Sequence, residues 1–317
     1  MKIQIAPPQA LHELGRRSNQ EDALFPPIGQ ATAADCLFLV CDGMGGHDHG
    51  EVASQTVAET IGRYITDHFP AETTLTDAII TDALAEAYNQ LDARDNPADR
   101  KKMGTTLTLL CLHRGGAIMA HIGDSRIYHL RPSSAAKGEG PEGAILYQSR
   151  DHSLVTDLYL AGELRREEMG SYAGRNVITR AMQPHQERRN RPDVAHTTDL
   201  RPGDYFLLCS DGVLETVSND QLIRLLAADA TDEEKCQRLR QLTANHADNH
   251  TAYIIRILSI ESEPADLSAP NDESRTRCNM VVLEREQEAE GITDTPVQST
   301  AKAQEGWLQR TIKKLFN

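Results

Sequence analysis

A short apolar run that ends in an aspartate and a cluster of glycines constrains the fold more than any other stretch. Residues 36–40 are all apolar, and a run of this length predicts a buried β-strand rather than a helix. Asp42 follows this strand, and glycines among residues 43–46 let the backbone turn sharply and approach another group closely. Residues 51–69 then predict a helix. The sequence therefore places a carboxylate where a buried strand gives way to a helix.

Asp42 has two interpretations in this local context. It can cap the tight turn between the strand and the helix, which is a purely structural role. Alternatively, its carboxylate and the free carbonyl groups beside it can bind a hard cation such as Mg²⁺ or Mn²⁺. These few residues alone do not separate the two interpretations.

Further acidic residues in similar positions favour metal binding. They lie beside predicted strands or in a charged cluster near the N-terminus: Asp124 after residues 117–122, Asp211 after residues 205–209, Asp248 before residues 251–258, and Glu21 and Asp22 after Arg17. Divalent ions need several anionic oxygens that converge from different strands. The repeated placement therefore predicts a metal centre with several carboxylates.

Together these residues and their neighbours resemble the bacterial form of the metal-dependent serine/threonine protein phosphatases of type 2C. The matching stretches follow the order of that family: residues 15–22, 42–46, 50–54, 104–106, 122–126, 151–153, 176–181, 202–204, 210–212 and 248–249. One such match would be weak evidence, but this many in one order is specific. The resemblance covers about residues 10–258.

The resemblance implies a role for each candidate site residue. The ligands of two divalent ions, Mn²⁺ or Mg²⁺, would be Asp42, the carbonyl group of Gly43, Asp211 and Asp248. Asp124 would bind a third, weaker ion, and Glu21 and Asp22 would hold metal-bound waters. Arg17 would bind the substrate phosphate, because its planar fork of donors suits phosphate oxygens. Arg17 and Asp42 are thus the residues expected to act in catalysis.

Arg17 has a rival in the neighbouring Arg16, which allows a second alignment. The spacing from Arg17 to Glu21 and Asp22 keeps that of the family, so we prefer Arg17. Gln20 stands where bacterial relatives usually have Asn.

Two further departures leave other roles open. Met44 stands where some eukaryotic relatives have a His, so the general acid is either His47 or a metal-bound water. His250 replaces the usual Ile after Asn249, and an outward-facing strand residue is a better interpretation of it than a metal ligand.

The implied reaction is the hydrolysis of phosphoserine and phosphothreonine on proteins by a metal-bridging water or hydroxide, without a covalent phosphoenzyme. The expected partners are phosphorylated proteins and a cognate kinase that acts on the same substrates in signal transduction. Two alternatives remain: a catalytically silent binding module on the same fold, and a hydrolase of small phosphoesters. The intact residues Asp42, Asp211 and Asp248 argue against a silent module.

Charge and composition exclude several other classes. A net charge of −14 argues against a nucleic-acid-binding protein, because phosphate backbones require Lys and Arg. The scattered cysteines form no C-x-x-C pair, so neither a zinc site nor a disulfide framework is indicated. No long apolar stretch predicts a membrane span, and the first residues lack the apolar core of a signal peptide. We therefore expect a cytoplasmic protein.

The resemblance implies an α+β fold: a four-layer α/β/β/α sandwich of two mainly antiparallel β-sheets flanked by helices. The periodicity predicts helices at residues 51–69, 75–93, 219–227 and 232–244, and one from Asp151 that is capped by Asp151 or Ser153. Strands are predicted at residues 36–40, 105–112, 117–122, 126–130, 144–148, 177–181, 193–198, 205–209 and 251–258, with a short edge strand before residue 14. Residues 162–174 are charged and irregular, and resemble the flap beside the catalytic cleft of the family.

The composition changes after residue 259. We expect a catalytic domain at residues 1–259 and a polar, disordered tail at residues 260–317, where Glu, Ser, Asp, Pro and Gln dominate. Residues 307–316 place apolar side chains, including Trp307, on one helical face and basic side chains on the other. This short amphipathic helix either packs on the domain or frays, or it docks to a partner or an anionic membrane surface.

Overall fold

The computed structural model describes residues 1–45, 49–69, 73–95, 103–133 and 143–261. Residues 260 and 261, which were predicted to begin the tail, instead belong to the last strand. The rest of the predicted tail, its terminal amphipathic helix and His47 lie outside the described residues.

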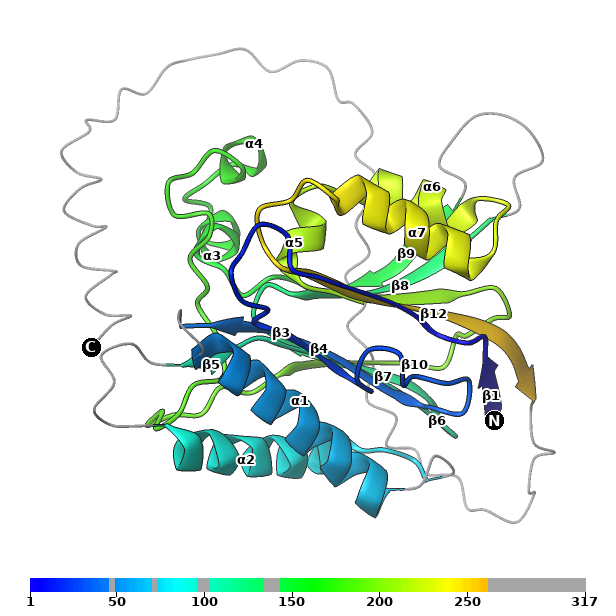
Figure 1. The fold of residues 1–317 in the computed structure, drawn as a ribbon, viewed down its shortest axis with the longest axis horizontal. Helices are drawn as coiled ribbons and strands as arrows, with labels where there is room; N and C mark the ends of the chain where they lie inside the picture. The colour runs from blue at the N-terminus through cyan, green and yellow to red at the C-terminus, as the bar shows by residue number, and fades with distance from the viewer. Residues whose placement is uncertain (46–48, 70–72, 96–102, 134–142, 262–317) are drawn as a thin grey trace. The chain divides into compact units, whose positions relative to one another are not determined.

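Two antiparallel β-sheets form the centre of the fold (Figure 1). The first sheet has the strand order β1 (Lys2–Ile5), β12 (His250–Glu261), β11 (Tyr205–Cys209), β8 (Arg126–Pro132) and β9 (Gly143–Gln148), and β2 (Gln9–Glu13) also pairs with β12. The second has the order β10 (Asp193–Thr197), β7 (Gly116–Ile122), β6 (Leu107–His113), β4 (Leu37–Met44) and β3 (Asp22–Phe25), and β5 (Gly104–Thr105) pairs with β4.

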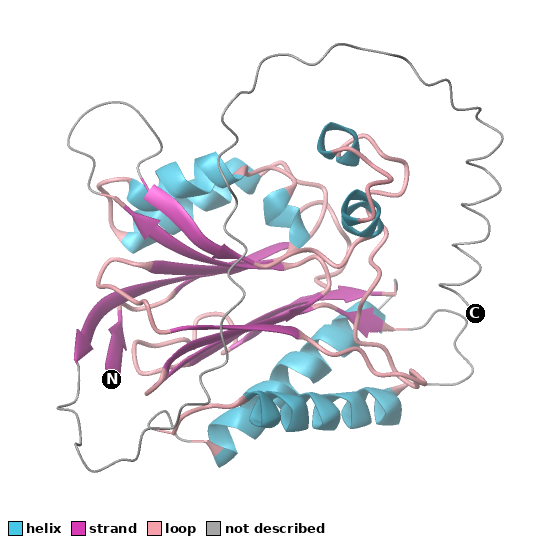
Figure 2. Ribbon diagram, turned by 180° about the vertical axis from the view of Figure 1, so that it is seen from behind, coloured by secondary structure: helices cyan, strands magenta, loops and turns pink. Residues whose placement is uncertain are grey.

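Helices cover the outer face of each sheet (Figure 2). The second sheet is covered by α1 (His49–His68) and α2 (Asp77–Arg94), and the first by α5 (Asp211–Leu214), α6 (Asn219–Ala227) and α7 (Asp232–Thr243). Two short helices, α3 (Leu154–Leu160) and α4 (Arg166–Met169), follow β9. This arrangement confirms the predicted four-layer sandwich.

The alternation of side chains along β4 explains why the sheets stack in this way. Leu37, Leu39 and Cys41 pack against the helices α1 and α2, whereas Phe38 and Val40 face the first sheet. Successive residues of a strand point to opposite faces, so a strand that is apolar throughout must be covered on both sides. The continuous apolar run of the sequence thus fixes β4 as an inner strand of a layered fold.

Most predicted elements agree with the structure within a few residues, and three differ. The predicted strand at residues 177–181 is wrong, because these residues form only an isolated bridge between Ser153 and Ile178. The helix predicted to begin at Asp151 begins at Leu154: Ser153 caps it, and the Asp151 side chain instead pairs with Arg126. The N-terminal segment forms two strands rather than one.

None of the helices in the described ranges has both the length and the apolar character required to cross a membrane.

Candidate active site

The first sheet brings three of the predicted acidic residues to one end. The last residue of β11 lies opposite the first residue of β8 and beside the start of β12. Asp211 follows β11, Asp248 precedes β12, and Asp124 precedes β8. Segments that are far apart in the sequence therefore meet where these three strands end or begin.

The second sheet adds two more carboxylates at the same edge. Asp42 on β4 lies directly opposite Asp22, the first residue of β3. A hydrogen bond of 2.8 Å from Ser210 Oγ to Asp22 Oδ2 joins this pair to the end of β11. The connection that carries Asp124 also runs from the second sheet to the first. Both sheets thus contribute acidic side chains to one cluster.

Asp42 and Asp211 lie close enough in this cluster for each to affect the ionisation of the other. Burial, together with the neighbouring Asp22 and Asp211, raises the pKa of Asp42 well above its ordinary range. Burial and Asp248 also raise the pKa of Asp211. Close packing of like charges with few compensating cations is the arrangement that a divalent ion stabilises.

Asp124 supplies a separate indication of a missing partner. Its Oδ1 atom is buried and has no hydrogen-bond partner. Burial and the charge of Asp211 raise the pKa of Asp124 to about 7. Buried polar atoms are almost always paired, so an orphaned carboxylate oxygen beside other carboxylates fits a cation ligand.

Arg17 forms an ion pair with Asp248. Its Nη2 atom donates to Asp248 Oδ2 at 2.5 Å, and its side chain remains 54% exposed. The guanidinium therefore lies at the solvent-facing rim of the cluster. Among the described residues, the neighbouring Arg16 side chain forms no hydrogen bond or ion pair with the acidic residues.

Asn249 fixes the N-terminal loop, a role that no local pattern in the sequence predicts. Its Nδ2 atom donates to the carbonyl groups of Leu14 and Asn19, and its Oδ1 atom accepts the N–H of Glu21. Gly15 in this loop has a φ of +62°, and a Cβ atom there would lie 2.1 Å from the carbonyl oxygen of Asp248. Only glycine allows the loop to pack so closely against the Asp248 segment.

The predicted residues Glu21 and Gly43 meet through their backbones. The N–H of Gly43 donates to the carbonyl group of Glu21 at 3.0 Å. Two threonines for which the sequence predicts no role bind the backbone of β4. Thr106 Oγ1 accepts the N–H of Asp42, and Thr105 Oγ1 donates to the carbonyl group of Asp42. The only hint of them in the sequence is their place in the 104–106 match.

His250 does not face outward as expected. It is buried, and its Nδ1 atom lies 3.0 Å from the carbonyl oxygen of Asp248. The predicted outward orientation is wrong because α5 covers this end of β12, where Gly212 packs against Asn249 and His250.

Three residues on β7, β10 and the loop before α3 form a second cluster with potential ligand atoms. The candidate atoms of His121, His152 and Asp193 lie within 4.8 Å of one another. However, the two imidazole rings are stacked at 4.7 Å with an angle of 8° between their planes. Ring-nitrogen lone pairs lie in the ring plane, so two stacked rings cannot both direct one at a single ion.

Hydrogen bonds and ion pairs instead hold His152 and Asp193, whereas the buried His121 Nδ1 has no hydrogen-bond partner among the described residues. His152 Nδ1 accepts the N–H of Gly123, and Arg180 pairs with Asp193 at 3.0 Å. The cluster therefore braces the connection that carries Asp124, and the acidic cluster is the better metal site.

The raised pKa values predict an unusual pH dependence for the metal-free protein. Asp22 and Asp124 both have a pKa of about 7 in the folded state. An acid with a raised folded-state pKa binds its proton more tightly in the folded than in the unfolded state, so stability falls as pH rises toward that pKa. We expect the melting temperature in chelator, measured by scanning calorimetry, to decrease from pH 6.5 to pH 8.

The measurement starts at pH 6.5 because burial lowers the pKa of His121. Deprotonation of this histidine makes stability rise with pH below the ordinary histidine pKa, which would oppose the expected decrease. Mn²⁺ should abolish the decrease, because a bound cation stabilises the ionised carboxylates. A melting temperature that is constant or rises over this range in chelator would contradict the raised pKa values of Asp22 and Asp124.

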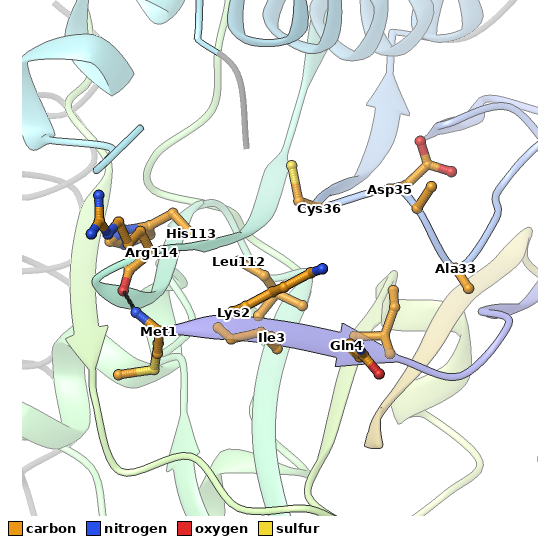
Figure 3. A pocket seen from close by; sticks show the side chains of 12 residues that line it. Met1, Lys2, Ile3, Gln4, Ala33, Asp35, Cys36, Leu112, His113 and Arg114 are labelled. Atoms are coloured by element: carbon orange, nitrogen blue, oxygen red, sulfur yellow. Dashed lines mark hydrogen bonds between the residues drawn. The ribbon is translucent and has the colours of Figure 1, made fainter. Parts of the chain in front are cut away.

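A cavity of about 490 Å³ lies beside β1 and Cys36, the residue that precedes β4 (Figure 3). Residues of β1, of the segment before β4 and of the end of β6 line it, among them Lys2, Cys36 and His113. It contains none of the predicted site residues, so we assign the chemistry to the acidic cluster.

Known proteins are similar to this chain in both sequence and fold. The family model of protein phosphatase 2C matches residues 12–138. A Streptococcus pyogenes protein described as a protein phosphatase 2C type is 32% identical over 252 residues, which cover 79% of this chain and 96% of that protein. The crystal structure of the Mycobacterium tuberculosis serine/threonine phosphatase PstP has a TM-score of 0.66 at 28% identity and covers 80% of this chain and 100% of that one. A structure of the PstP catalytic domain with two manganese ions has a TM-score of 0.63 at 28% identity, covering 81% and 100% of the two chains.

Proposed function

Because the chain belongs to the protein phosphatase 2C family, we propose that its acidic cluster is the active site of a metal-dependent serine/threonine protein phosphatase. As a member of this family, the chain hydrolyses phosphoserine and phosphothreonine on proteins and depends on divalent metal ions. The convergence of carboxylates from both sheets at one edge supports the proposed location of that activity.

We propose that two divalent ions, Mn²⁺ or Mg²⁺, bind between the two sheets. Their ligands would be Asp42, the carbonyl group of Gly43, Asp211 and Asp248. Asp124 would take part in a third, weaker site, which its orphaned Oδ1 atom supports. An all-oxygen donor set of this kind suits hard divalent cations.

Glu21 and Asp22 would support the ligands and orient waters around them. Asp22 is buried, and the Ser210 hydroxyl fixes one of its oxygens. Glu21 is held by Asn249 and by its backbone contact with Gly43. The shell around the metal ligands is therefore tied to both sheets, which limits its movement.

The bound ions would supply an activated water for attack on phosphorus and would offset the charge of the phosphate. Arg17 would bind the phosphate oxygens, because its guanidinium provides parallel donors at the rim of the cluster. Its contact with Asp248 would hold the guanidinium beside the proposed metal site. Charge that develops on the phosphate in the transition state would then meet a fixed cation.

The partners of this activity are proteins phosphorylated on serine or threonine. A protein kinase that modifies the same substrates is the partner we propose, because a phosphatase acts only on groups that a kinase has added. We assign the catalytic domain to the predicted residues 1–259 together with residues 260 and 261, which complete β12. The cytoplasmic location and the docking role of the terminal helix at residues 307–316 remain predictions.

Two other functions fit the fold less well. A silent binding module would not need Asp42, Asp211 and Asp248 intact and converging. A hydrolase of small phosphoesters would share the metal centre and differ only in what surrounds the phosphate.

A panel of substrates tests the proposed function. Phosphate release should occur with phosphoserine and phosphothreonine peptides, stop in excess chelator and return when Mn²⁺ is added. Turnover of small phosphoesters in preference to every phosphopeptide would favour the metabolite hydrolase. A folded protein that binds Mn²⁺ but turns over none of these substrates would favour the binding module.

A further inference from the structure

A buried histidine links the segments that carry two of the proposed metal ligands. His246 is only 8% exposed. Its Nδ1 atom accepts the N–H of Asp248 at 3.1 Å, and its Nε2 atom lies 2.9 Å from Glu215 Oε2. Because Nδ1 accepts a hydrogen bond, the ring proton is on Nε2, which donates to Glu215. One imidazole ring thus uses both of its nitrogens to connect two segments.

The two ends of this connection are close to the proposed ligands. Glu215 is the C-cap residue of α5, and its N–H donates to the carbonyl group of Asp211 at 3.0 Å. It therefore lies one helical turn from Asp211, while His246 lies two residues before Asp248. The ring joins the end of the helix that starts with one ligand to the loop that carries the other.

A close backbone contact holds the beginning of α5 against this loop. A Cβ atom on Gly212 would lie 2.1 Å from the carbonyl oxygen of Asn249, so the first turn of α5 packs directly on the backbone. The bond between His246 and Glu215 restrains the other end of α5. Both ends of α5, the helix that begins at Asp211, are thus in contact with the segment that carries Asp248.

We propose that His246 is a positioning residue that, through Glu215, sets the separation of Asp211 and Asp248 and thereby the affinity for divalent cations. The inference rests on the proposed metal site of these two aspartates. Partners that hold a metal ligand in place from outside the coordination sphere typically change metal affinity by about 10–100-fold when removed.

His246→Asn separates this role from a local one. An Asn side chain can still accept the N–H two residues ahead, as in an Asx turn, but it is too short to reach Glu215. We expect Mn²⁺ to bind about tenfold more weakly by calorimetry. Turnover of a phosphothreonine peptide should recover at saturating Mn²⁺, and the melting temperature in chelator should stay near that of the wild type. Wild-type Mn²⁺ affinity in this variant would overturn the proposal.

Glu215 provides a matched pair of variants on a half-exposed side chain, where folding is not at risk. Glu215→Gln and Glu215→Ala both remove the negative charge, but only Gln keeps an oxygen that accepts from His246. We expect the Ala variant to bind Mn²⁺ several-fold more weakly than the Gln variant. Equal affinities would mean that only the charge matters and would overturn the proposal.

Two controls complete the experiment. Glu59→Ala removes a comparably exposed partner, which pairs with Arg63 at 3.5 Å within α1, and should leave Mn²⁺ affinity unchanged. An equal loss in this control would also overturn the proposal. Asp211→Asn tests the metal site itself: if it retains wild-type Mn²⁺ binding, the proposed function fails, and if it alone loses binding, only the positioning role of His246 fails.

Discussion

Replacing Asp42 with Asn should lower turnover of a phosphothreonine peptide by about 10³-fold or more, since loss of a direct ligand exceeds the roughly 10–100-fold effect of an outer partner. Asn has nearly the same shape, and the threonine hydrogen bonds to the Asp42 backbone do not depend on its side chain. The variant should therefore fold. Stability and activity should change in opposite directions. Removing one of several crowded carboxylates should raise the melting temperature in chelator, while activity is lost.

Steady-state kinetics over a range of Mn²⁺ concentrations and calorimetry in chelator measure both effects. Asp82→Asn is a matched control, because Asp82 is exposed on α2 and should change neither quantity. Near-wild-type turnover by the Asp42 variant at any Mn²⁺ concentration would contradict the assignment of Asp42 as a ligand.

Replacing Arg17 with Ala should lower kcat/KM by roughly 10²-fold, the lower end of the cost of losing one donor to a developing anion. Arg17→Lys should recover part of this loss, because a point charge replaces a planar fork of donors. Mn²⁺ affinity should be unchanged or tighter in the Ala variant, since Arg17 no longer pairs with Asp248. This combination separates phosphate binding from metal binding.

Arg16→Ala is the matched control for Arg17, because it tests the rival alignment with the same chemical change one residue away. We expect its kcat/KM to equal that of the wild type. If Arg16→Ala loses activity and Arg17→Ala keeps it, the assignment of the phosphate-binding residue is wrong.

The sequence predicted the acidic cluster because its members share a local pattern. Asp42 and Asp211 each follow a short apolar run, and apolar runs of that length form inner strands whose ends meet at sheet edges. The layered fold was predictable for the same reason, since β4 and β11 are apolar on both faces. Local hydrophobicity and chain order therefore carried most of the prediction.

Residues whose roles depend on long-range contacts were not predictable in this way. Asn249 is more than 200 residues from the loop that it fixes, and His246 contacts Glu215 across 31 residues. Asp151 was expected as a possible helix cap, but its bidentate pairing with Arg126 on β8 outweighs that local role. No periodicity marks such partners, because their contacts arise only when the sheets assemble.

The site also shows why the central claim depends on metal binding. Carboxylates from both sheets are packed together with raised pKa values, and one buried oxygen has no partner. Such an arrangement costs stability by itself and is stabilised by cations, as expected of a functional site rather than of a structural core.

The most direct test of this account is the stoichiometry of Mn²⁺ binding by calorimetry, with phosphopeptide turnover measured on the same preparations of wild type and Asp211→Asn. The account predicts about two tightly bound Mn²⁺ ions per wild-type chain, weaker or fewer in the variant, and a loss of turnover in parallel. Unchanged Mn²⁺ binding and turnover in Asp211→Asn would show that the acidic cluster is not the catalytic metal centre.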